Sequence, residues 1–487
     1  MELYSSSDGY KLYHGNMLDM LEVVKPESVD SIITDPPYEL NFMGKGWDNS
    51  GIAFQKTTWQ KCYSALKAGG YLLAFGGTRT FHRIAVAIED AGFEIRDTIM
   101  WLYGSGFPKS MDIGKSIEAK LTTGSANTQE FKNLNGTKAE KGNWGIARGA
   151  YEQGARPSNY DEDGQMRTEK VEYTTEEGAY WDGWGTALKP AFEPIIVARK
   201  PCDGSTTDNV LKYGVGGINI DECRVGNEII GGGTIPSFRD VGKKSKDNVG
   251  IDKLSFGQVE NAERVEYDTH EGRFPSNVIL TYDNTDEKEV CGGMPDTVGG
   301  KTNSPLLDIR GNKYNSANTY LDITYERGYD DSGNASRYYY CAKASKKDRD
   351  EGLKSFTSKS GGTYNFRQDG SLDGAIPKNK NMHPTVKPTA LMQYLVRLVT
   401  PNGGTVLDPF NGSGSTGKAV MYENVERNKG YKYIGIELTE QYLPISRARI
   451  EYAESGALAE FAEDGTLVMK EPPVKQRRKN LLRSKLI

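Results

Sequence analysis

The chain is predicted to adopt an α/β fold with a doubly wound, mostly parallel sheet, and three observations support this prediction. Short apolar runs alternate with segments whose apolar residues recur at helical spacing, which is typical of strands joined by crossover helices. The alternation occurs in two blocks, one near each end of the chain. A long polar stretch, rich in Gly, Asn, Thr and Glu, separates them. We therefore expect a sheet built from two distant halves, with large insertions between them.

Each block has its own series of elements, and a further strand is expected between the blocks. The first block has a strand at 29–34, a helix at 57–67 stopped by Gly69-Gly70, a strand at 71–75, a helix at 79–91 closed by Gly92 and a strand at 97–103. The second has a helix at 389–399, a strand at 404–408, a glycine-rich turn with its helix, and a strand at 431–437. The run KPAFEPIIVARK at 189–200 is expected to be a further strand of the sheet.

Composition excludes several classes of protein. No run approaches the roughly 20 apolar residues that cross a bilayer, and no secretory signal is visible, so a cytoplasmic location is expected. The five cysteines are scattered without a CxxC pair and only four histidines occur, so neither disulfides nor a metal site is expected. The net charge of −5 argues against indiscriminate coating of nucleic acid, although residues 471–487 carry a net +5.

A glycine-rich loop lies in the string LDPFNGSGSTGKAV. Gly412, Gly414 and Gly417 fit a GxGxxG pattern between a strand and a helix, and Glu437 ends the next strand. Such glycines let the backbone approach a nucleotide, and a carboxylate at that position accepts hydrogen bonds from ribose hydroxyls. The string also nearly matches a phosphate-binding P-loop, but Ala419 replaces the hydroxyl residue that would hold magnesium. The loop predicts an adenosine-type ligand without specifying which one.

The tetrapeptide Asp35-Pro36-Pro37-Tyr38 follows the first expected strand directly. In doubly wound sheets, ligands bind beyond the carboxyl ends of strands, so these residues are candidates for catalysis. An exocyclic base amine is a poor nucleophile because its lone pair is delocalised into the ring. The Asp35 carboxylate and the Pro36 carbonyl would accept its two N–H bonds and localise that pair. The prolines stiffen the loop, and Tyr38 offers a flat face to a base taken out of the duplex.

The order and content of these motifs resemble the amino-type DNA methyltransferases of the permuted beta group, in which a DPPY or SPPY motif comes early and the glycine-rich motif late. Four further segments resemble the methylases of phages and mobile elements: WLYGSGFPKS, KPAFEPI, GRFPSNVIL and SRYYYCAKASKKDR. The resemblance implies a circularly permuted, class I S-adenosylmethionine-dependent fold. It divides the chain into a catalytic half at 1–110, an insertion at 111–185, a sheet strand at 186–201, a target-recognition region at 202–382, a cofactor half at 383–455 and a basic tail at 456–487.

The resemblance also implies roles for single residues. Glu437 would bind the ribose, Thr385 and Lys387 would meet the methionine carboxylate, and Asn16 replaces the family's usual Asp near the adenine of the cofactor. Trp101 and Phe107 lie where the family places an aromatic against the flipped base, although core packing is an equal alternative for Trp101. The residues expected to line the S-adenosylmethionine pocket are Asp408, Pro409, Phe410, Gly412 and Gly414.

The predicted function is transfer of a methyl group from S-adenosylmethionine to an exocyclic amine of double-stranded DNA, adenine N6 before cytosine N4. The rival classes are a methyltransferase acting on protein glutamine or RNA, a catalytically silent DNA-binding subunit and a nicotinamide-dependent oxidoreductase. Motif order counts against the first, and the intact DPPY counts against the other two. No membrane association is expected, and a homodimer and a restriction endonuclease partner both stay open.

Overall fold

The structure is a computed structural model, and it describes residues 1–40, 46–103, 110–126, 173–231, 269–283, 346–354 and 378–456, with shorter pieces between 234 and 469. None of the helices in this described part combines the length and the apolar character that a membrane span requires. The chain divides into two compact units. Unit 1 comprises Met1–Leu102, Glu193–Arg349 and Val386–Ala457, and unit 2 comprises Tyr103–Phe192, Asp350–Thr385 and Leu458–Ile487.

Unit 1 is built on a ten-stranded sheet, most of which is parallel. Five strands that are neighbours in the sheet, β2, β20, β19, β3 and β4, run parallel to one another. The strand β1 pairs antiparallel with β2, and β6 pairs antiparallel with β4. In order across the sheet the strands are β1 (Glu2–Ser6), β2 (Tyr10–His14), β20 (Lys432–Glu437), β19 (Thr405–Asp408), β3 (Val29–Thr34), β4 (Leu66–Phe75), β6 (Phe192–Arg199), β5 (Glu94–Tyr103), β11 (Val278–Asp283) and β16 (Tyr340–Ala344).

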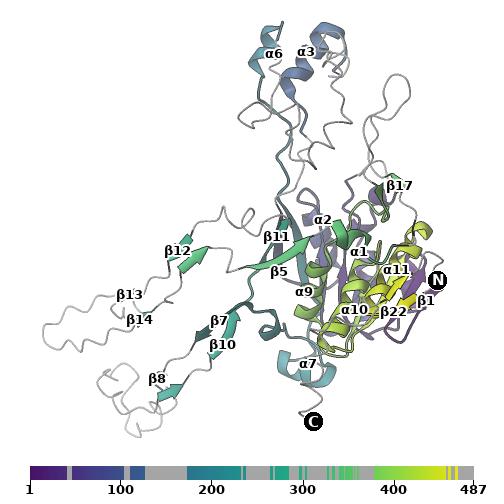
Figure 1. Ribbon diagram of the computed structural model, residues 1–487, viewed down its shortest axis with the longest axis vertical. Coiled ribbons are helices and arrows are strands. Elements are labelled where there is room, and N and C mark those ends of the chain that lie inside the picture. The colour runs from purple at the N-terminus through teal and green to yellow at the C-terminus, as the bar shows by residue number, and fades with distance from the viewer. Residues whose placement is uncertain are drawn as a thin grey trace, which may run out of the picture. The chain divides into compact units, whose positions relative to one another are not determined.

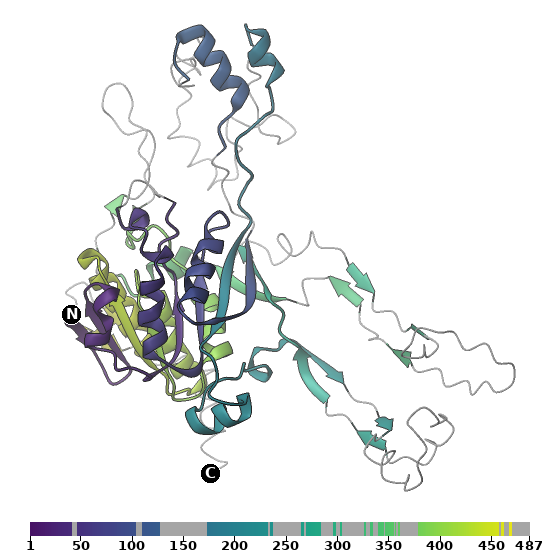
Figure 2. The ribbon, with the colours of Figure 1, turned by 180° about the vertical axis from the view of Figure 1, so that it is seen from behind.

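Helices cover both faces of this sheet, as the prediction of a doubly wound fold requires. Figure 1 shows α9 (Thr389–Val399), α10 (Ser415–Arg427) and α11 (Leu443–Glu454) in front. Seen from behind, the purple and blue helices of the N-terminal block, including α1 (Lys56–Ala65) and α2 (Phe81–Asp90), lie in front instead (Figure 2). The predicted fold class is therefore confirmed.

The two covered faces explain the composition of the central elements. All six residues of β3 are buried, which suits a parallel strand that packs against helices on both sides. On one face, Ile32 of β3 and Leu72 of β4 pack in a cluster with Trp59 of α1 and Ile88 of α2. Trp59 is completely buried, and its indole N–H donates to the carbonyl of Ala53 at 2.9 Å, so that its polar atom is satisfied in the core.

One expected boundary in this block is wrong. The helix ends at Ala65 and β4 begins at Leu66, so that Gly69 and Gly70 lie inside the strand instead of stopping the helix. Gly69 has a positive φ of 78°, and a Cβ there would lie 2.1 Å from the Asn209 amide nitrogen. The pairing of β4 with β3 shifts register at this point. The two glycines therefore form an irregularity within a strand, where backbones approach closely.

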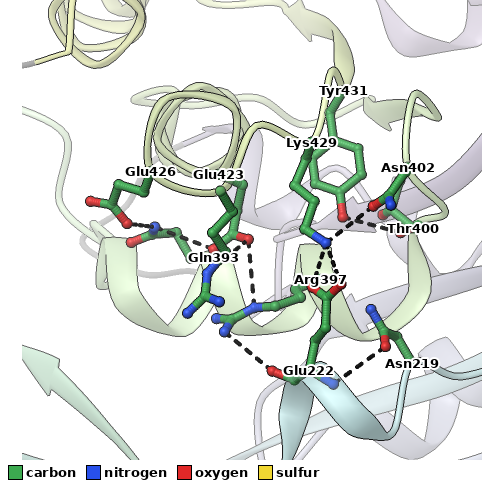
Figure 3. A network of polar contacts seen from close by, with 11 residues as sticks. Asn219, Glu222, Gln393, Arg397, Thr400, Asn402, Glu423, Glu426, Lys429 and Tyr431 are labelled. Carbon is green, nitrogen blue, oxygen red and sulfur yellow. Dashed lines mark hydrogen bonds and ion pairs between the residues drawn. The ribbon is translucent and has the colours of Figure 1, made fainter. Parts of the chain in front are cut away.

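A polar network closes the amino edge of the sheet, before β19 and β20 begin (Figure 3). Lys429 forms an ion pair with Glu222 and donates to Asn402. The fully buried Glu423 of α10 lies 3.5 Å from Arg397 of α9. The network thus connects α9, α10 and the short helix η5 (Asp221–Cys223) at the end of the strands opposite to Asp35.

Unit 2 contains two described helices, α3 (Ile113–Thr123) and α6 (Glu176–Tyr180). The Glu118 carboxylate accepts from the backbone N–H groups of Thr174 and Thr175, at 2.7 and 3.1 Å, and so joins the two. At the stem of the unit, the Tyr103 N–H donates to the Ala191 carbonyl at 2.9 Å. The chain therefore leaves β5 and enters β6 through adjacent backbone positions.

The remaining elements are short. The helices are η1 (Met17–Glu22), η3 (Gly46–Asn49), η4 (Ile52–Phe54), α7 (Thr206–Tyr213), α8 (Lys346–Asp350) and η9 (Glu440–Tyr442). The strands are β7 (Val225–Gly231), β8 (Thr234–Pro236), β9 (Arg264–Glu266), β10 (Thr269–Arg273), β12 (Asp296–Val298), β13 (Thr302–Asn303), β14 (Glu326–Arg327), β15 (Ser332–Asn334), β17 (Lys359–Ser360), β18 (Lys378–Asn379), β21 (Ala459–Phe461) and β22 (Leu467–Met469).

Candidate active site

The DPPY loop leaves the carboxyl end of β3 and is held on both sides. The Thr80 hydroxyl donates to the Tyr38 carbonyl at 2.8 Å. The buried Asp48 carboxylate accepts from the backbone N–H groups of Glu39 and Leu40, at 2.9 and 3.2 Å. Glu39 needs this support because its φ of 56° is unfavourable for a residue with a side chain. The loop is thus fixed before any substrate arrives.

Asp35 lies in a cluster of four polar side chains. The Lys387 ammonium is 2.9 Å from the Asp35 carboxylate and 3.1 Å from the Glu193 carboxylate. It also donates to the Tyr38 hydroxyl at 3.1 Å, and that hydroxyl donates to Glu193 at 2.7 Å. The Lys387 side chain is only 7% exposed, whereas Asp35 and Glu193 keep 19% and 21%. The two carboxylate side chains are therefore more exposed than the lysine side chain that contacts both.

Aromatic rings enclose the ammonium. The Lys387 nitrogen lies 5.0 Å from the ring centroid of Phe75, 5.2 Å from that of Tyr38 and 6.0 Å from that of Trp101. Trp101 is buried and meets Phe75 edge to face. Trp101 therefore packs in the core close to Lys387, and its contact with a base stays a prediction. Phe107 lies outside the described residues.

Burial shapes the charges in this cluster. It raises the pKa of Asp35, Lys387 opposes that increase, and Glu193 adds to it. Burial alone would lower the pKa of Lys387, but Asp35 and Glu193 outweigh it and raise that pKa. The phenol of Tyr38 is likewise held in its neutral form, because burial and then the nearby carboxylates raise its pKa. The lysine is therefore charged, and it favours the ionised form of Asp35.

The glycine-rich loop follows β19, the strand next to β3. Asp408, at the end of β19, accepts from the Thr34 hydroxyl at 2.7 Å, from the Thr416 hydroxyl at 2.6 Å and from the Phe410 N–H at 3.1 Å. Because Thr34 directly precedes Asp35, this carboxylate connects the two motifs. Asp408 was expected to line the cofactor pocket, and the structure gives it partners within the chain. Burial raises its pKa to about 6.

Glu437 ends β20, on the other side of β19. One carboxylate oxygen accepts from the Gly412 N–H and the other from the Thr439 N–H, both at 2.7 Å. Burial raises its pKa to about 7. Asn16 lies nearby, since the Gly15 N–H donates to the Glu437 carbonyl, but the Asn16 amide oxygen already accepts from the Leu18 N–H at 3.0 Å. The structure therefore brings Asn16, Glu437 and the glycine-rich loop together.

The glycines of the loop are required by its shape. Gly412 and Gly414 have φ angles of 50° and 75°. A Cβ on Gly414 would lie 2.5 Å from the Ser446 hydroxyl, and one on Gly417 would lie 2.5 Å from the Tyr433 ring. Gly414 caps α10 without a side-chain hydrogen bond. With Glu437 as acceptor, this loop fits the adenosine part of S-adenosylmethionine.

Two residues in the segment before α9, Thr385 and Lys387, were expected to contact the methionine carboxylate. Thr385 belongs to unit 2, where its carbonyl oxygen bonds to the His383 ring at 2.9 Å, so its contact with the cofactor stays a prediction. Lys387 belongs to unit 1 and contacts the DPPY residue Asp35. A contact with the methionine carboxylate was expected for Lys387, and this contact stays a prediction beside the observed ion pair with Asp35.

Two acidic residues of the site were not predicted. Glu193 opens β6, and because β6 runs antiparallel to β4, the start of β6 reaches the same edge as the carboxyl ends of the parallel strands. The sequence feature that could have identified Glu193 is the carboxylate in KPAFEPI, just before an apolar run. Asp348 accepts from the N–H of Thr389 at 2.8 Å and pairs with the fully buried Lys418 at 2.5 Å. Lys418 thus pairs with Asp348, which is consistent with the conclusion from Ala419 that this loop is not a phosphate-binding P-loop.

The glycine-rich loop and the DPPY loop follow adjacent strands of a doubly wound sheet, as expected for a class I S-adenosylmethionine-dependent methyltransferase. The model of the DNA methylase family, which comprises N6-adenine and N4-cytosine enzymes, matches residues 29–448. The chain belongs to this family. The predictions of an amino-type DNA methyltransferase and of S-adenosylmethionine as its cofactor are confirmed at this level.

Individual relatives agree over different lengths. The Type II methyltransferase M2.LlaDCHI of Lactococcus lactis subsp. cremoris is 24% identical over 263 residues, which are 50% of this chain and 90% of that protein. The DNA adenine methyltransferase YhdJ of Escherichia coli K12 is 35% identical over 81 residues, 17% of this chain and 26% of that protein. Four further relatives are matched over only 24–28% of their length. The structure of the cytosine-N4-specific PvuII DNA methyltransferase is 13% identical with a TM-score of 0.36, over 92% of this chain and 88% of that one.

Proposed function

We propose that the chain methylates the N6 amine of adenine in double-stranded DNA, after the base has been flipped out of the duplex. The observation that carries this proposal is the hydrogen bond of 2.7 Å between Thr34 and Asp408, because it joins the catalytic loop to the cofactor loop. Methyl donor and acceptor would therefore meet at one edge of the sheet. Such positioning supplies much of the rate when the methyl group is already activated.

S-adenosylmethionine would supply that activated methyl group, bound to a sulfonium. The Gly412 and Gly414 loop and Glu437 would hold its adenosine part. Asp35 and the Pro36 carbonyl would accept the two amine N–H bonds and turn the nitrogen lone pair toward the methyl group. As the N–CH3 bond forms, the S–CH3 bond of the sulfonium would break and leave a neutral thioether, so that the positive charge would pass to the amine nitrogen. One of its protons then passes to the Asp35 carboxylate and from there to water, which restores the site.

The variant Asp35→Ala tests this role. It is expected to lose at least about 100-fold in methyl transfer while its affinity for S-adenosylmethionine stays, because the carboxylate lies on the substrate side. Transfer of a labelled methyl group and calorimetric cofactor binding measure the two effects. Asp90→Ala, at the exposed end of α2, is the control. Activity above about a tenth of wild type in the Asp35 variant would contradict the role.

Adenine is proposed as the acceptor because the Asp-containing tetrapeptide resembles adenine enzymes of the permuted group. The match to a relative named as an adenine methyltransferase supports the same choice. Cytosine N4 is the alternative, since a carboxylate would also polarise that amine. Mass spectrometry of nucleosides from DNA methylated in vitro decides between them. N4-methylcytosine as the main product would overturn the choice of base and leave the amine-transfer chemistry intact.

We also propose a role for residues 202–382 and an origin, location and assembly for the whole enzyme. Residues 202–382 would hold the target-recognition region, although β11 and β16 from this range pair at the edge of the catalytic sheet. The early DPPY and the late glycine-rich loop support a circularly permuted, phage-like enzyme that works where its host's DNA lies, in the cytoplasm. A homodimer and a cognate endonuclease are left open. Size-exclusion chromatography with light scattering tests the first.

A further inference from the structure

The cluster around Lys387 has a charge balance that the transfer reaction alone does not explain. Two carboxylates, Asp35 and Glu193, share one ammonium, so the cluster carries a net charge of −1 when all three are ionised. A buried pair of carboxylates without a cation would share a proton, because like charges at close range cannot both ionise. The ammonium of Lys387 lies between the two carboxylates and offsets part of their negative charge.

Lys387 is itself held in place from two directions. Its ammonium bonds to Glu193 on β6 and to Tyr38, whose hydroxyl donates to the same Glu193 oxygen. Its backbone directly precedes Pro388, the N-cap of α9, and Asp348 fixes the next residue, Thr389. An ammonium with a free choice of partners would satisfy Asp35 only part of the time. Glu193 and the start of α9 restrict that choice.

We propose that Lys387 and Glu193 are positioning residues for amine methylation, with Lys387 keeping the Asp35 carboxylate ionised and Glu193 anchoring Lys387 and Tyr38 beside it. This inference rests on the proposed role of Asp35 as acceptor of the amine. The charge of −1 left over in the cluster would stabilise the positive charge that develops on the amine nitrogen. Neither residue needs to touch the reacting atoms.

The groups that face Asp35 determine the sign of the expected effects. They are Tyr38 from its own loop, Glu193 from β6, Lys387 from the segment before α9 and Asp408 from β19. Of these, Lys387 favours the ionised form of Asp35, and Glu193 disfavours it. Removing the positive charge must therefore move the ionisation of Asp35 to higher pH, and removing the Glu193 charge must move it to lower pH.

The test is the pH profile of single-turnover methyl transfer with saturating cofactor and DNA. Activity needs ionised Asp35, so the acidic limb of the profile reports its ionisation. In Lys387→Met, this limb is expected to move up by about one to three pH units. In Glu193→Gln, it is expected to move down. Lys387→Arg restores the charge and should return the limb toward its wild-type position, even where turnover is slower.

The chain offers a matched control at the opposite edge of the sheet. The buried Lys429 forms an ion pair there with the more exposed Glu222 (Figure 3), and Lys429→Met and Glu222→Gln remove the same charges. These variants should leave the acidic limb unchanged. Limbs that do not move in Lys387→Met and Glu193→Gln, or that move in the same direction, would overturn the inference and leave both residues with a structural role.

A second measurement separates this inference from the proposed function. The carboxyl ¹³C shift of Asp35, assigned by comparison with Asp35→Asn in aspartate-labelled protein, follows its ionisation without any turnover. Opposite shifts of this titration in the two variants support the inference, and unshifted titrations overturn it. If wild-type protein transfers no methyl group to DNA, the proposed function fails, whatever the titration shows.

Discussion

Glu437 illustrates how one residue can serve both the fold and the ligand. Its carboxylate accepts from the N–H groups of Gly412 and Thr439, so it supports the glycine-rich loop before any ribose is bound. Each oxygen of an ionised carboxylate can accept a second hydrogen bond, so this carboxylate keeps acceptor capacity for a ribose hydroxyl even with the Thr439 side chain also bonded to it. Because the pKa of Glu437 is raised to about 7, ribose binding and ionisation of this residue are expected to be linked.

We expect S-adenosylmethionine to bind more weakly as the pH falls through about 7, since the protonated form of Glu437 is the poorer acceptor. In Glu437→Gln, the affinity at pH 8 should fall roughly tenfold or more, and the dependence on pH should flatten. Calorimetry between pH 6 and 8 measures both effects, with the exposed Glu440→Gln as control. An unchanged pH dependence in Glu437→Gln would assign the titration to another group.

At the residue scale, the sequence identifies functional groups best where they end parallel strands. Asp35 and Glu437 were predicted because each stands at the end of a readable apolar run, at the edge where ligands bind. Glu193 starts its strand, and it reaches the same edge only because β6 runs in the opposite direction. Strand direction is a property of the assembled sheet, and neither composition nor periodicity contains it. The position of Lys387 could not be predicted either, because it depends on where α9 packs in the assembled fold.

At the element scale, the entry into α10 is determined by close backbone packing. Gly414 and Gly403 share almost the same φ, 75° and 76°, but their surroundings differ. A Cβ at Gly414 would meet the Ser446 hydroxyl at 2.5 Å, whereas a Cβ at Gly403 would meet nothing within 4 Å. The pair therefore separates the cost of a left-handed backbone from the cost of a steric clash.

Gly403→Ala is expected to cost about 1–2 kcal/mol in the free energy of unfolding, through its backbone conformation alone. Gly414→Ala should cost more than that and should also weaken cofactor binding, because α11 must move away from the loop. Denaturant unfolding and cofactor titration of both variants measure the difference. Equal losses in the two variants would mean that the contact with Ser446 relaxes at no cost.

Asp348 connects two further elements, the start of α9 and the buried face of α10. Asp348→Asn keeps the shape but leaves the Lys418 ammonium buried without its counter-charge, which is expected to cost about 3–5 kcal/mol. Adding Lys418→Met removes that charge, so the double variant should be more stable than Asp348→Asn alone. Chemical denaturation measures these stabilities. Asp203→Asn, in the exposed pair with Lys212, should change stability little, and a double variant no better than the single one would refute this coupling.

At the scale of the whole molecule, the sequence predicted six of the ten strands of the sheet, because both of its blocks show clear periodicity. It could not show that β11 and β16, from the long polar stretch, extend the same sheet, since their apolar runs are short and isolated. It also misplaced the start of β4, because Gly69-Gly70 is a helix-stop signal in sequence and an irregular strand in structure. A glycine is needed at position 69 because the Asn209 side chain lies too close for a Cβ, and this contact exists only in the folded chain.

The stem at Tyr103 and Ala191 yields a prediction at this scale. Because adjacent backbone positions join β5 to β6, residues 111–186 should be replaceable by a short Gly/Ser linker at little cost in loop-closure entropy. The shortened protein is expected to bind S-adenosylmethionine as the full chain does. Calorimetry checks the binding and circular dichroism the fold. Loss of cofactor binding in a protein that is still folded would show that the segment supports the cofactor half.

This stem also bears on how such a chain can change over generations. A segment that leaves and re-enters a sheet at neighbouring residues can be gained, lost or exchanged in a single recombination event, while the strands on either side keep their partners. Between Tyr103 and Ala191, a segment can thus be inserted without changing the strand pairing of the catalytic sheet. Related chains can then differ in length between these two positions, while the residues that surround Asp35 stay in register.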